Sequence, residues 1–302
     1  MDAGFKLAAK LVRAHSDKVS RDQLQVLDVA SAGGEPAFTI AEVLPKARVY
    51  ATDIAPAMVE QIRKRAEEGG ISNVEPGVAD GESLSAFADQ SLDAVTCTWG
   101  LMFMPRWQKA VQEFARVLRE GGAVVLTVWE KHPDSLFQRM AKVLDTLSPG
   151  FKGLVDPEVL GGDEGRSVAE QLRASAFGDV SVIKFSVPVM FLPPASGGGD
   201  DGADHGSDLA KQIWEGCALG TPLEQTLKSW EARGREGVRQ EALEVFRAQL
   251  EEDWAQGREP LGFPPPRRAG SKHGSPSLEE PSSRVLYVQA LAFVGYKKRA
   301  DS

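Results

Sequence analysis

The chain has 302 residues, of which 42% are hydrophobic and 26% are charged, and its net charge is -8. This size and composition predict a soluble globular protein with one elaborated domain, or one domain and a smaller cap. Phosphate binding needs a clustered positive face, and this acidic chain has no dense block of Lys and Arg. We therefore expect a small-molecule or protein partner and no nucleic acid, and the oligomeric state is left open.

The sequence also argues against a membrane span, a disulfide framework and a zinc site. No apolar run approaches the roughly 18 residues that a membrane helix needs. Cys97 and Cys217 are too few and too far apart for a disulfide framework or a metal site. We therefore expect no metal and a reducing, cytoplasmic location, while import into an organelle is not excluded.

Residues 1–24 have basic and apolar residues at roughly helical spacing. A transit peptide has the same pattern, but transit peptides are poor in acids and this segment contains Asp2, Asp17 and Asp22. We favour an amphipathic N-terminal helix, with a buried stripe formed by Phe5, Ala8, Ala9 and Val12.

From Gln25 to Trp129 short apolar runs alternate with amphipathic stretches, which predicts repeated βαβ units around a parallel sheet. The predicted strands are 25–29, 48–52, 74–78, 94–98 and 123–129. The predicted helices between them are 36–44, 57–68 and 109–119, and Glu120–Gly122 is predicted to cap the last of these.

The later part of the chain has a different organisation. We predict a core over 25–192, a flexible loop over 193–208, a helical insert or lid over 209–256, a second flexible loop over 257–284, and a last core strand and tail over 285–302. Both loops are rich in Gly, Pro and Ser, a composition that disfavours packing.

The first strand leads into "QVLDVASAGGEPAF", residues 25–38. In a strand-loop-helix unit, small residues let a ligand approach outward-pointing backbone N–H groups. The same pattern also fits a tight βα turn in any α/β protein, so the loop alone predicts little.

Acidic residues follow the second and third predicted strands. Asp53 is placed to accept hydrogen bonds from both ribose hydroxyls, although it could equally cap the next helix. Asp80 and the N–H of Gly81 are placed to bind an adenine ring, and Thr98 and Trp99 follow the fourth strand. Ligands of open parallel sheets bind at this carboxyl edge, so these groups converge on one crevice.

Five segments together resemble a class I S-adenosylmethionine-dependent methyltransferase, of the group that includes the ubiquinone and menaquinone biosynthesis methyltransferases. They are "VLDVASAGGEPA", "VYATDIAPAMV", "VADGESL", "SLDAVTCTWGLMFMP" and "AVQEFARVLREGGAVVLTVW". The resemblance covers residues 25–129 and implies an α/β, Rossmann-like, doubly wound sheet of seven mostly parallel strands with an antiparallel last strand. S-adenosyl-L-methionine is the implied cofactor, and a small-molecule methyl acceptor is the implied partner.

The resemblance also implies a role for individual residues. The methionine part of the cofactor would lie among Asp28, Ala30, Ser31, Ala32, Gly33 and Gly34. Asp53 would bind the ribose, Ile54 and Met58 would sandwich the adenosine, and Asp80 and Gly81 would bind the adenine. Thr98 and Trp99 would lie at the edge of the pocket, near the sulfonium.

Ala32 departs from the glycine that the resemblance leads us to expect. Its Cβ disfavours a positive φ and adds a methyl group close to the cofactor carboxylate, so we expect weakened but retained binding, with Gly33 absorbing some of the strain.

Methyl transfer from a sulfonium is an in-line displacement, and a general base is needed only if the acceptor must lose a proton. His132 follows the fifth strand and is our candidate base, although a solvated loop histidine has the same pattern.

Two other functions are alternatives to methyl transfer. A nicotinamide-dependent dehydrogenase would need a G-x-G-x-x-G run that "ASAGGEPAF" lacks. A non-catalytic regulatory or assembly protein could keep the fold and tolerate Ala32.

Overall fold

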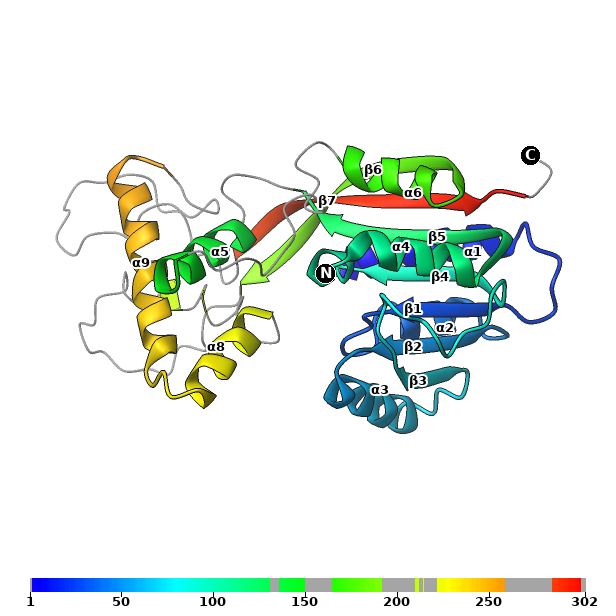
Figure 1. Ribbon diagram of the computed structural model, residues 1–302, viewed down its shortest axis with the longest axis horizontal. Coiled ribbons are helices and arrows are strands. Elements are labelled where there is room, and N and C mark those ends of the chain that lie inside the picture. Colours follow the sequence, from blue (N-terminus) through cyan, green and yellow to red (C-terminus); the bar gives the residue numbers. More distant parts are fainter. Residues whose placement is uncertain are drawn as a thin grey trace. The chain divides into compact units, whose positions relative to one another are not determined.

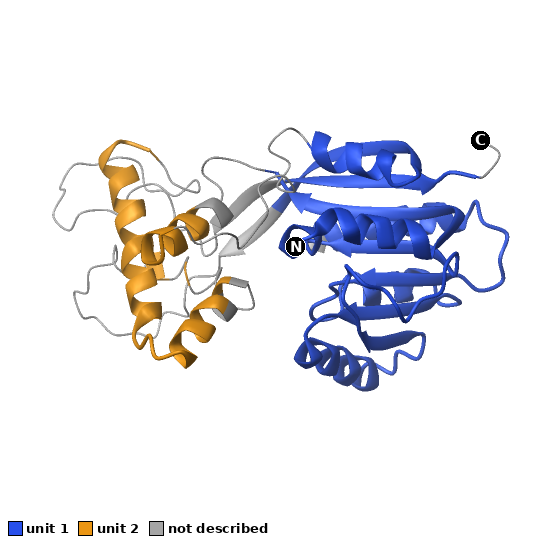
Figure 2. Ribbon diagram, viewed as in Figure 1, with its two compact units in different colours: residues 1–131, 155–187, 288–302 blue, residues 132–154, 188–287 orange. Residues whose placement is uncertain are grey.

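The computed structural model describes residues 2–130, 136–149, 165–191, 210–211, 214, 222–258 and 284–299. The chain divides into two compact units (Figure 2). Unit 1 comprises residues 1–131, 155–187 and 288–302, and unit 2 comprises residues 132–154 and 188–287. Each unit is described separately below. The two loops predicted over 193–208 and 257–284 lie almost wholly outside the described residues.

Unit 1 is built on a seven-stranded sheet with the order β3-β2-β1-β4-β5-β7-β6 (Figure 1). The strands are β1 (Gln25–Val29), β2 (Arg48–Asp53), β3 (Val74–Val78), β4 (Leu92–Thr98), β5 (Leu118–Trp129), β6 (Phe177–Phe191) and β7 (Arg284–Lys297). Strands β1 to β5 pair in parallel, whereas β7 pairs with β5 in the antiparallel direction. The predicted α/β class and the mostly parallel seven-stranded sheet with an antiparallel final strand are confirmed.

The central strands are apolar because helices cover both faces of the sheet. All seven residues of β4 are buried, and four of the five residues of β1 are buried. Strands that are buried on both faces are continuous apolar runs, not alternating ones. This explains why the sequence pattern predicted both bounds of β1 and the last residue of β4.

Helices α1 (Asp2–Ser16), α2 (Ala37–Val43) and α3 (Pro56–Glu68) share one hydrophobic core with β1, β2 and β4. The predicted stripe of α1 is confirmed for Ala8, Ala9 and Val12, which are almost fully buried, while Phe5 is half-buried. Helices α4 (Trp107–Val117) and α6 (Arg166–Ala174) contact each other and lie in front of the sheet in Figure 1. The short 3-10 helix η1 (Leu101–Phe103) follows β4.

The predicted helix cap at Glu120–Gly122 is wrong. Helix α4 ends at Val117 and the chain enters β5 at once, so the three residues lie inside the strand. Leu118 pairs with Leu92, and the register shifts between Leu92 and Ala94. Gly121 takes a positive φ of 74°, and this conformation lets the strand continue through the irregularity instead of breaking there.

Unit 2 contains three described helices: α5 (Leu136–Leu147), α8 (Pro222–Ala232) and α9 (Val238–Ala255). Helix α9 contacts both α5 and α8. An ion pair of 2.6 Å joins Arg139 of α5 to Asp253 of α9, and both residues are largely buried. Trp214 packs on Phe246 with ring centroids 5.4 Å apart. The three helices therefore have a small core of their own.

Among the described residues, no helix is long and apolar enough to cross a membrane. The same part of the chain contains no cluster of three or more His, Cys, Asp or Glu side chains that could hold a metal ion. Cys97 is a free thiol within β4, and burial raises its pKa.

Candidate functional site at the carboxyl edge of the sheet

The loop after β1 has an unusual backbone conformation. Ala30, Ala32 and Gly34 all have positive φ angles, of 57°, 47° and 102°. The N–H of Ser31 donates to the carbonyl of Thr52 at 2.9 Å, and the N–H of Gly34 donates to the carbonyl of Ser31 at 2.7 Å. The left-handed residues thus fold the loop back against the end of β2, and the N–H groups of Ser31 and Gly34 are satisfied within the protein.

Gly34 is the position where a side chain is excluded outright. A Cβ built on it would lie 2.1 Å from the Phe38 ring, in addition to the strain of its φ. Gly33 has no positive φ, and a Cβ there would meet its nearest neighbour at an ordinary 3.6 Å. The expectation that Gly33 absorbs the strain of the loop is therefore wrong: Ala32 itself adopts the left-handed conformation.

We expect an Ala32→Gly substitution to raise the free energy of unfolding by about 1 kcal/mol, because glycine adopts a left-handed conformation without the Cβ penalty. Urea denaturation measures this change. The matched control is Ala57→Gly, at an exposed position in the first turn of α3, where the same loss of a methyl group should be destabilising. Equal effects at the two positions would contradict the assignment of strain to Ala32.

Asp28 is a fully buried carboxyl group at the centre of the carboxyl edge. It accepts hydrogen bonds from the hydroxyls of Ser31 at 2.5 Å and Thr96 at 2.6 Å. Burial raises the pKa of Asp28 to about 7, against the opposing effect of these hydrogen bonds. Asp28 therefore joins β1, β4 and the loop, and its charge changes near neutral pH.

Asp53 at the end of β2 is bonded to backbone on two sides. Its Oδ2 accepts the N–H of Ala32 at 2.9 Å, and its Oδ1 accepts the N–H of Ala55 at 2.9 Å. Ala55 is the N-cap residue of α3 and has no side-chain cap, so Asp53 orders the entry to the helix without being its cap. Each carboxylate oxygen has a further lone pair, which leaves acceptor capacity for a diol.

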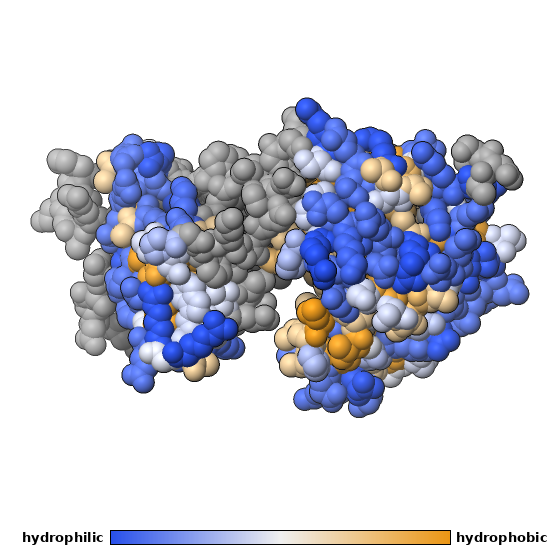
Figure 3. All heavy atoms as spheres, viewed as in Figure 1, coloured by the Kyte–Doolittle hydropathy of each residue, from blue (hydrophilic) through white to orange (hydrophobic). Residues whose placement is uncertain are grey.

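Beside Asp53 the edge is apolar and open to solvent. Ile54 is 67% exposed, and Val78, the register partner of Asp53 in β3, is 59% exposed. Met58 on α3 is half-buried. Figure 3 shows hydrophobic side chains gathered at the lower left of unit 1, on the side where Figure 1 places the start of α3. Apolar surface of this kind suits a planar ring.

Asp80 and Gly81 follow β3 in a tight turn. Asp80 Oδ1 accepts the N–H of Glu82 at 2.8 Å, and a Cβ on Gly81 would lie 2.8 Å from Met104 Cε. The buried Glu82 carboxylate accepts the backbone N–H of Arg106 at 2.6 Å and its Nε at 2.7 Å. Glu82 thus ties this turn to the segment after β4, a role that the sequence analysis did not assign.

Thr98 and Trp99 close the edge at the end of β4. Trp99 has a positive φ of 62°, its N–H donates to the carbonyl of Thr127 at 3.0 Å, and its ring stacks on Trp129 at 3.9 Å with an interplanar angle of 9°. Gly4 of α1 lies so close to this ring that a Cβ there would be 2.5 Å from Cζ2. Among the described residues, the buried Thr98 hydroxyl and Trp99 Nε1 have no hydrogen-bond partner within the protein.

The candidate base is not tested by this geometry, because His132 lies outside the described residues. Glu130, on the same segment, pairs with Lys184 at 2.7 Å. His15 is buried far from the carboxyl edge: its Nε2 lies 3.1 Å from the carbonyl oxygen of Asp93, and burial lowers its pKa.

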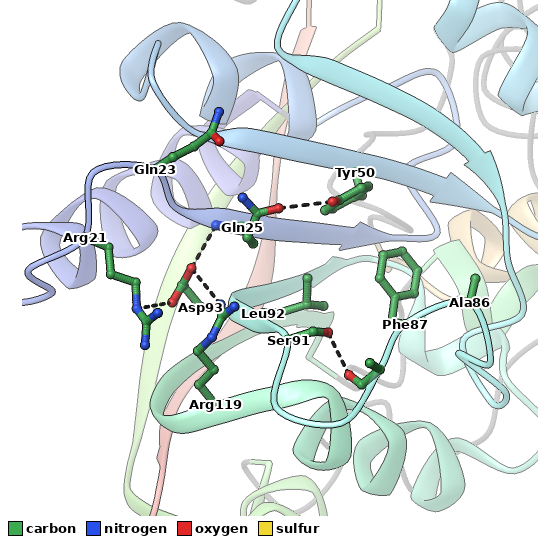
Figure 4. A pocket seen from close by; sticks show the side chains of 11 residues that line it. Arg21, Gln23, Gln25, Tyr50, Ala86, Phe87, Ser91, Leu92, Asp93 and Arg119 are labelled. Carbon is green, nitrogen blue, oxygen red and sulfur yellow. Dashed lines mark hydrogen bonds and ion pairs between the residues drawn. The ribbon is translucent and has the colours of Figure 1, made fainter.

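A cavity of about 400 Å³ lies at the opposite, amino edge of the sheet (Figure 4). Arg21 and Arg119 both converge on the buried Asp93, each at 3.0 Å, and Asp93 also accepts the N–H of Gln25 at 2.8 Å. The Asp93 carboxylate lies between the two guanidinium groups. This cluster therefore joins the starts of β1, β4 and β5 to one another. Asp93 is accordingly separate from the candidate site.

Part of the chain is similar in sequence to known methyltransferases. Residues 26–122 match the family model described as a methyltransferase domain. The ubiquinone/menaquinone biosynthesis C-methyltransferase of Paracoccus denitrificans is 34% identical over 118 residues, which are 39% of this chain and 47% of that protein. The demethylmenaquinone methyltransferase of Deinococcus radiodurans is 29% identical over 190 residues, or 59% of this chain and 75% of that protein.

Residues 26–122 resemble the methyltransferase domain of these proteins. The cofactor of class I methyltransferases is S-adenosylmethionine. The solved YcgJ protein of Bacillus subtilis has the same fold, with a TM-score of 0.55 at 18% identity over 99% of this chain and 100% of that one. The chain spans about half the length of the Paracoccus protein and of several mycobacterial relatives.

The fold brings the predicted cofactor residues to one edge. Asp28, the loop of residues 30–34, Asp53, Asp80 and Thr98 all lie at or just after the carboxyl ends of β1 to β4. Sequence reasoning missed Val78, Glu82 and Arg65, whose contacts depend on how turns and helices fold back over the edge. None of the three had a signal in the sequence, because the exposure of Val78 and its pairing with Asp53 are seen only in the structure.

Proposed function

We propose that the protein transfers the methyl group of S-adenosyl-L-methionine to a small-molecule acceptor. The observation that carries this proposal is the left-handed loop after β1, whose Ala32 N–H is bonded to the carboxylate of Asp53. This bond holds the small-residue loop and a carboxylate next to each other, and a cofactor with an amino-acid end and a ribose needs such a pair.

The described residues fit each part of that cofactor. The loop of residues 30–34, which the buried Asp28 holds through Ser31, is suited to the methionine end, Asp53 to the ribose hydroxyls, and the exposed Ile54 with Val78 to the adenine ring. The buried Trp99 Nε1 and Thr98 hydroxyl, which have no partner among the described residues, would each be satisfied by a hydrogen bond to a polar group of a ligand.

When bound, the cofactor supplies an activated sulfonium leaving group, so the chain mainly has to bind, orient and exclude water. The stacked rings of Trp99 and Trp129 form a dry wall at the end of β4 and β5. Two carboxyl groups of unit 1 are already engaged, since Asp28 accepts two hydroxyl donors and Glu130 pairs with Lys184. A general base role for His132 is part of the proposal only if the acceptor must lose a proton.

Isothermal titration calorimetry with S-adenosylmethionine and S-adenosylhomocysteine tests the binding step. We expect saturable binding of both at micromolar to sub-millimolar concentration, and no binding of NAD as the control ligand. A folded protein that binds neither at millimolar concentration would overturn the proposal.

The catalytic step is tested separately, by assaying S-adenosylhomocysteine formation across panels of phenols, quinols, amines and carboxylic acids. The relatives named as C-methyltransferases make aromatic carbon acceptors the first panel to screen. Cofactor binding without product in every panel would favour a non-catalytic protein that keeps the fold.

A further inference from the structure

Arg65, near the end of α3, reaches back to the loop that follows β1. Its Nη1 donates to the carbonyl oxygen of Gly33, and its Nη2 lies 3.3 Å from Oε1 of Glu35. Its guanidinium carbon lies 4.5 Å from the centre of the Phe38 ring. One side chain therefore contacts the loop backbone, the loop carboxylate and the first turn of α2.

The groups that Arg65 contacts are themselves joined. The second carboxylate oxygen of Glu35 accepts the hydroxyl of Thr39 at 2.7 Å and its N–H at 3.3 Å. The Phe38 ring also lies directly beside Gly34, where it leaves no room for a side chain. A shift of the guanidinium group would therefore release the loop and the start of α2 together.

The loop is also held from a second direction. The Asp53 carboxylate accepts the N–H of Ala32, while Arg65 donates to the C=O of the next residue, Gly33. These two polar groups flank the residue whose left-handed conformation is strained. A strained backbone conformation persists only where its surroundings determine it strongly, and here β2 and α3 supply one contact each.

We propose that Arg65 is a positioning residue for the cofactor: it holds the loop in the binding geometry without itself touching the ligand. The proposal rests on the proposed function, since the loop is taken as the cofactor site. The ion pair alone would not give this role, because Arg65 and Glu35 are 48% and 28% exposed and partly solvated pairs contribute little. The proposed role rests instead on the hydrogen bond from Arg65 to Gly33 and on the contact of its guanidinium group with the Phe38 ring.

The test is an Arg65→Met substitution, which keeps an apolar stem and removes all five donors. We expect the Kd for S-adenosylhomocysteine, measured by calorimetry, to rise about tenfold, the effect of one charge-assisted hydrogen bond. The matched control is Arg63→Met on the same helix, where Arg63 pairs only with the exposed Glu60 at 3.4 Å among the contacts the structure gives. The control should leave the Kd within about twofold of wild type.

A double-mutant cycle separates positioning from general stabilisation. In an Ala32→Gly background the loop no longer needs to be held against strain, so Arg65→Met should raise the Kd by about threefold or less. Arg65→Lys, which retains one donor for Gly33, should recover part of the affinity. A purely structural role would lower the unfolding midpoint equally in both backgrounds and leave the Kd unchanged.

Amide hydrogen exchange of the ligand-free protein gives a readout that does not depend on the proposed function. We expect the amides of Ala32 and Gly34 to exchange at least several-fold faster in Arg65→Met than in wild type or Arg63→Met. Wild-type protein that fails to bind the ligand overturns the proposed function, while faster exchange would still support the hold on the loop. Unchanged exchange together with an unchanged Kd overturns the role of Arg65.

Discussion

An Asp53→Ala variant is expected to bind S-adenosylhomocysteine about 30-fold to 1000-fold more weakly than wild type. Two charge-assisted hydrogen bonds to the ribose would be lost, roughly 2 to 4 kcal/mol in binding free energy. The variant also loses the bonds from Asp53 to the N–H groups of Ala32 and Ala55, so the loop and the entry to α3 would become less ordered. Calorimetric titration gives the affinity.

Two controls make this result interpretable. Asp17→Ala removes an exposed carboxylate on the surface near the end of α1 and should leave the affinity unchanged. Urea denaturation of Asp53→Ala establishes that the variant is folded at the temperature of the titration. A folded Asp53→Ala protein with wild-type affinity would remove the basis of the whole site assignment.

The second large effect concerns the pH dependence of stability through Asp28. Its pKa is raised from 3.8 to about 7 in the folded protein, so the folded state binds this proton more tightly than the unfolded state does. The resulting stabilisation is complete below about pH 4 and is lost as the pH rises towards 7, a change on the order of 4 kcal/mol. At neutral pH and above, the buried carboxylate is a net cost to folding.

An Asp28→Asn variant isolates this contribution from that of the other carboxyl groups. As the pH rises from about 4 to 7, the wild-type protein should lose unfolding free energy relative to the Asp28→Asn variant. Urea denaturation at half-unit pH intervals measures it. A difference that stays constant across this window would show that Asp28 remains ionised throughout.

Much of the sheet could be predicted from the sequence because its central strands are buried on both faces. Strands β1 and β3 have the predicted bounds, and β2 extends one residue further than predicted. Ligands of open parallel sheets bind at the carboxyl ends of the strands, and this was sufficient to predict that Asp28, Asp53 and Asp80 lie at one edge. The predicted first residues of β4 and β5 were too late in the chain. The pairing of Leu92 with Leu118 extends both strands and overrides the helix-capping preference of the Glu-Gly-Gly sequence.

The contacts that hold the site could not be predicted in the same way. Arg65 is one of two arginines in α3, and only the three-dimensional course of the loop distinguishes it from Arg63. The left-handed conformation of Ala32 is likewise set by its neighbours, through Asp53 and Gly33, and opposes its own backbone preference. The stacking of Trp99 on Trp129 also could not be predicted, because it depends on the positive φ of Trp99.

The antiparallel pairing of β5 with β7 has a consequence for synthesis on the ribosome. It joins Ala123 to Tyr296, so all of unit 2 must emerge before the sheet can be completed. Until then the apolar run Val124–Val128 forms an unpaired strand edge, which is a template for aggregation. Nascent chains arrested between about residues 140 and 280 should therefore depend on chaperones more than the finished protein does, and unit 2 delays the last step of folding in unit 1.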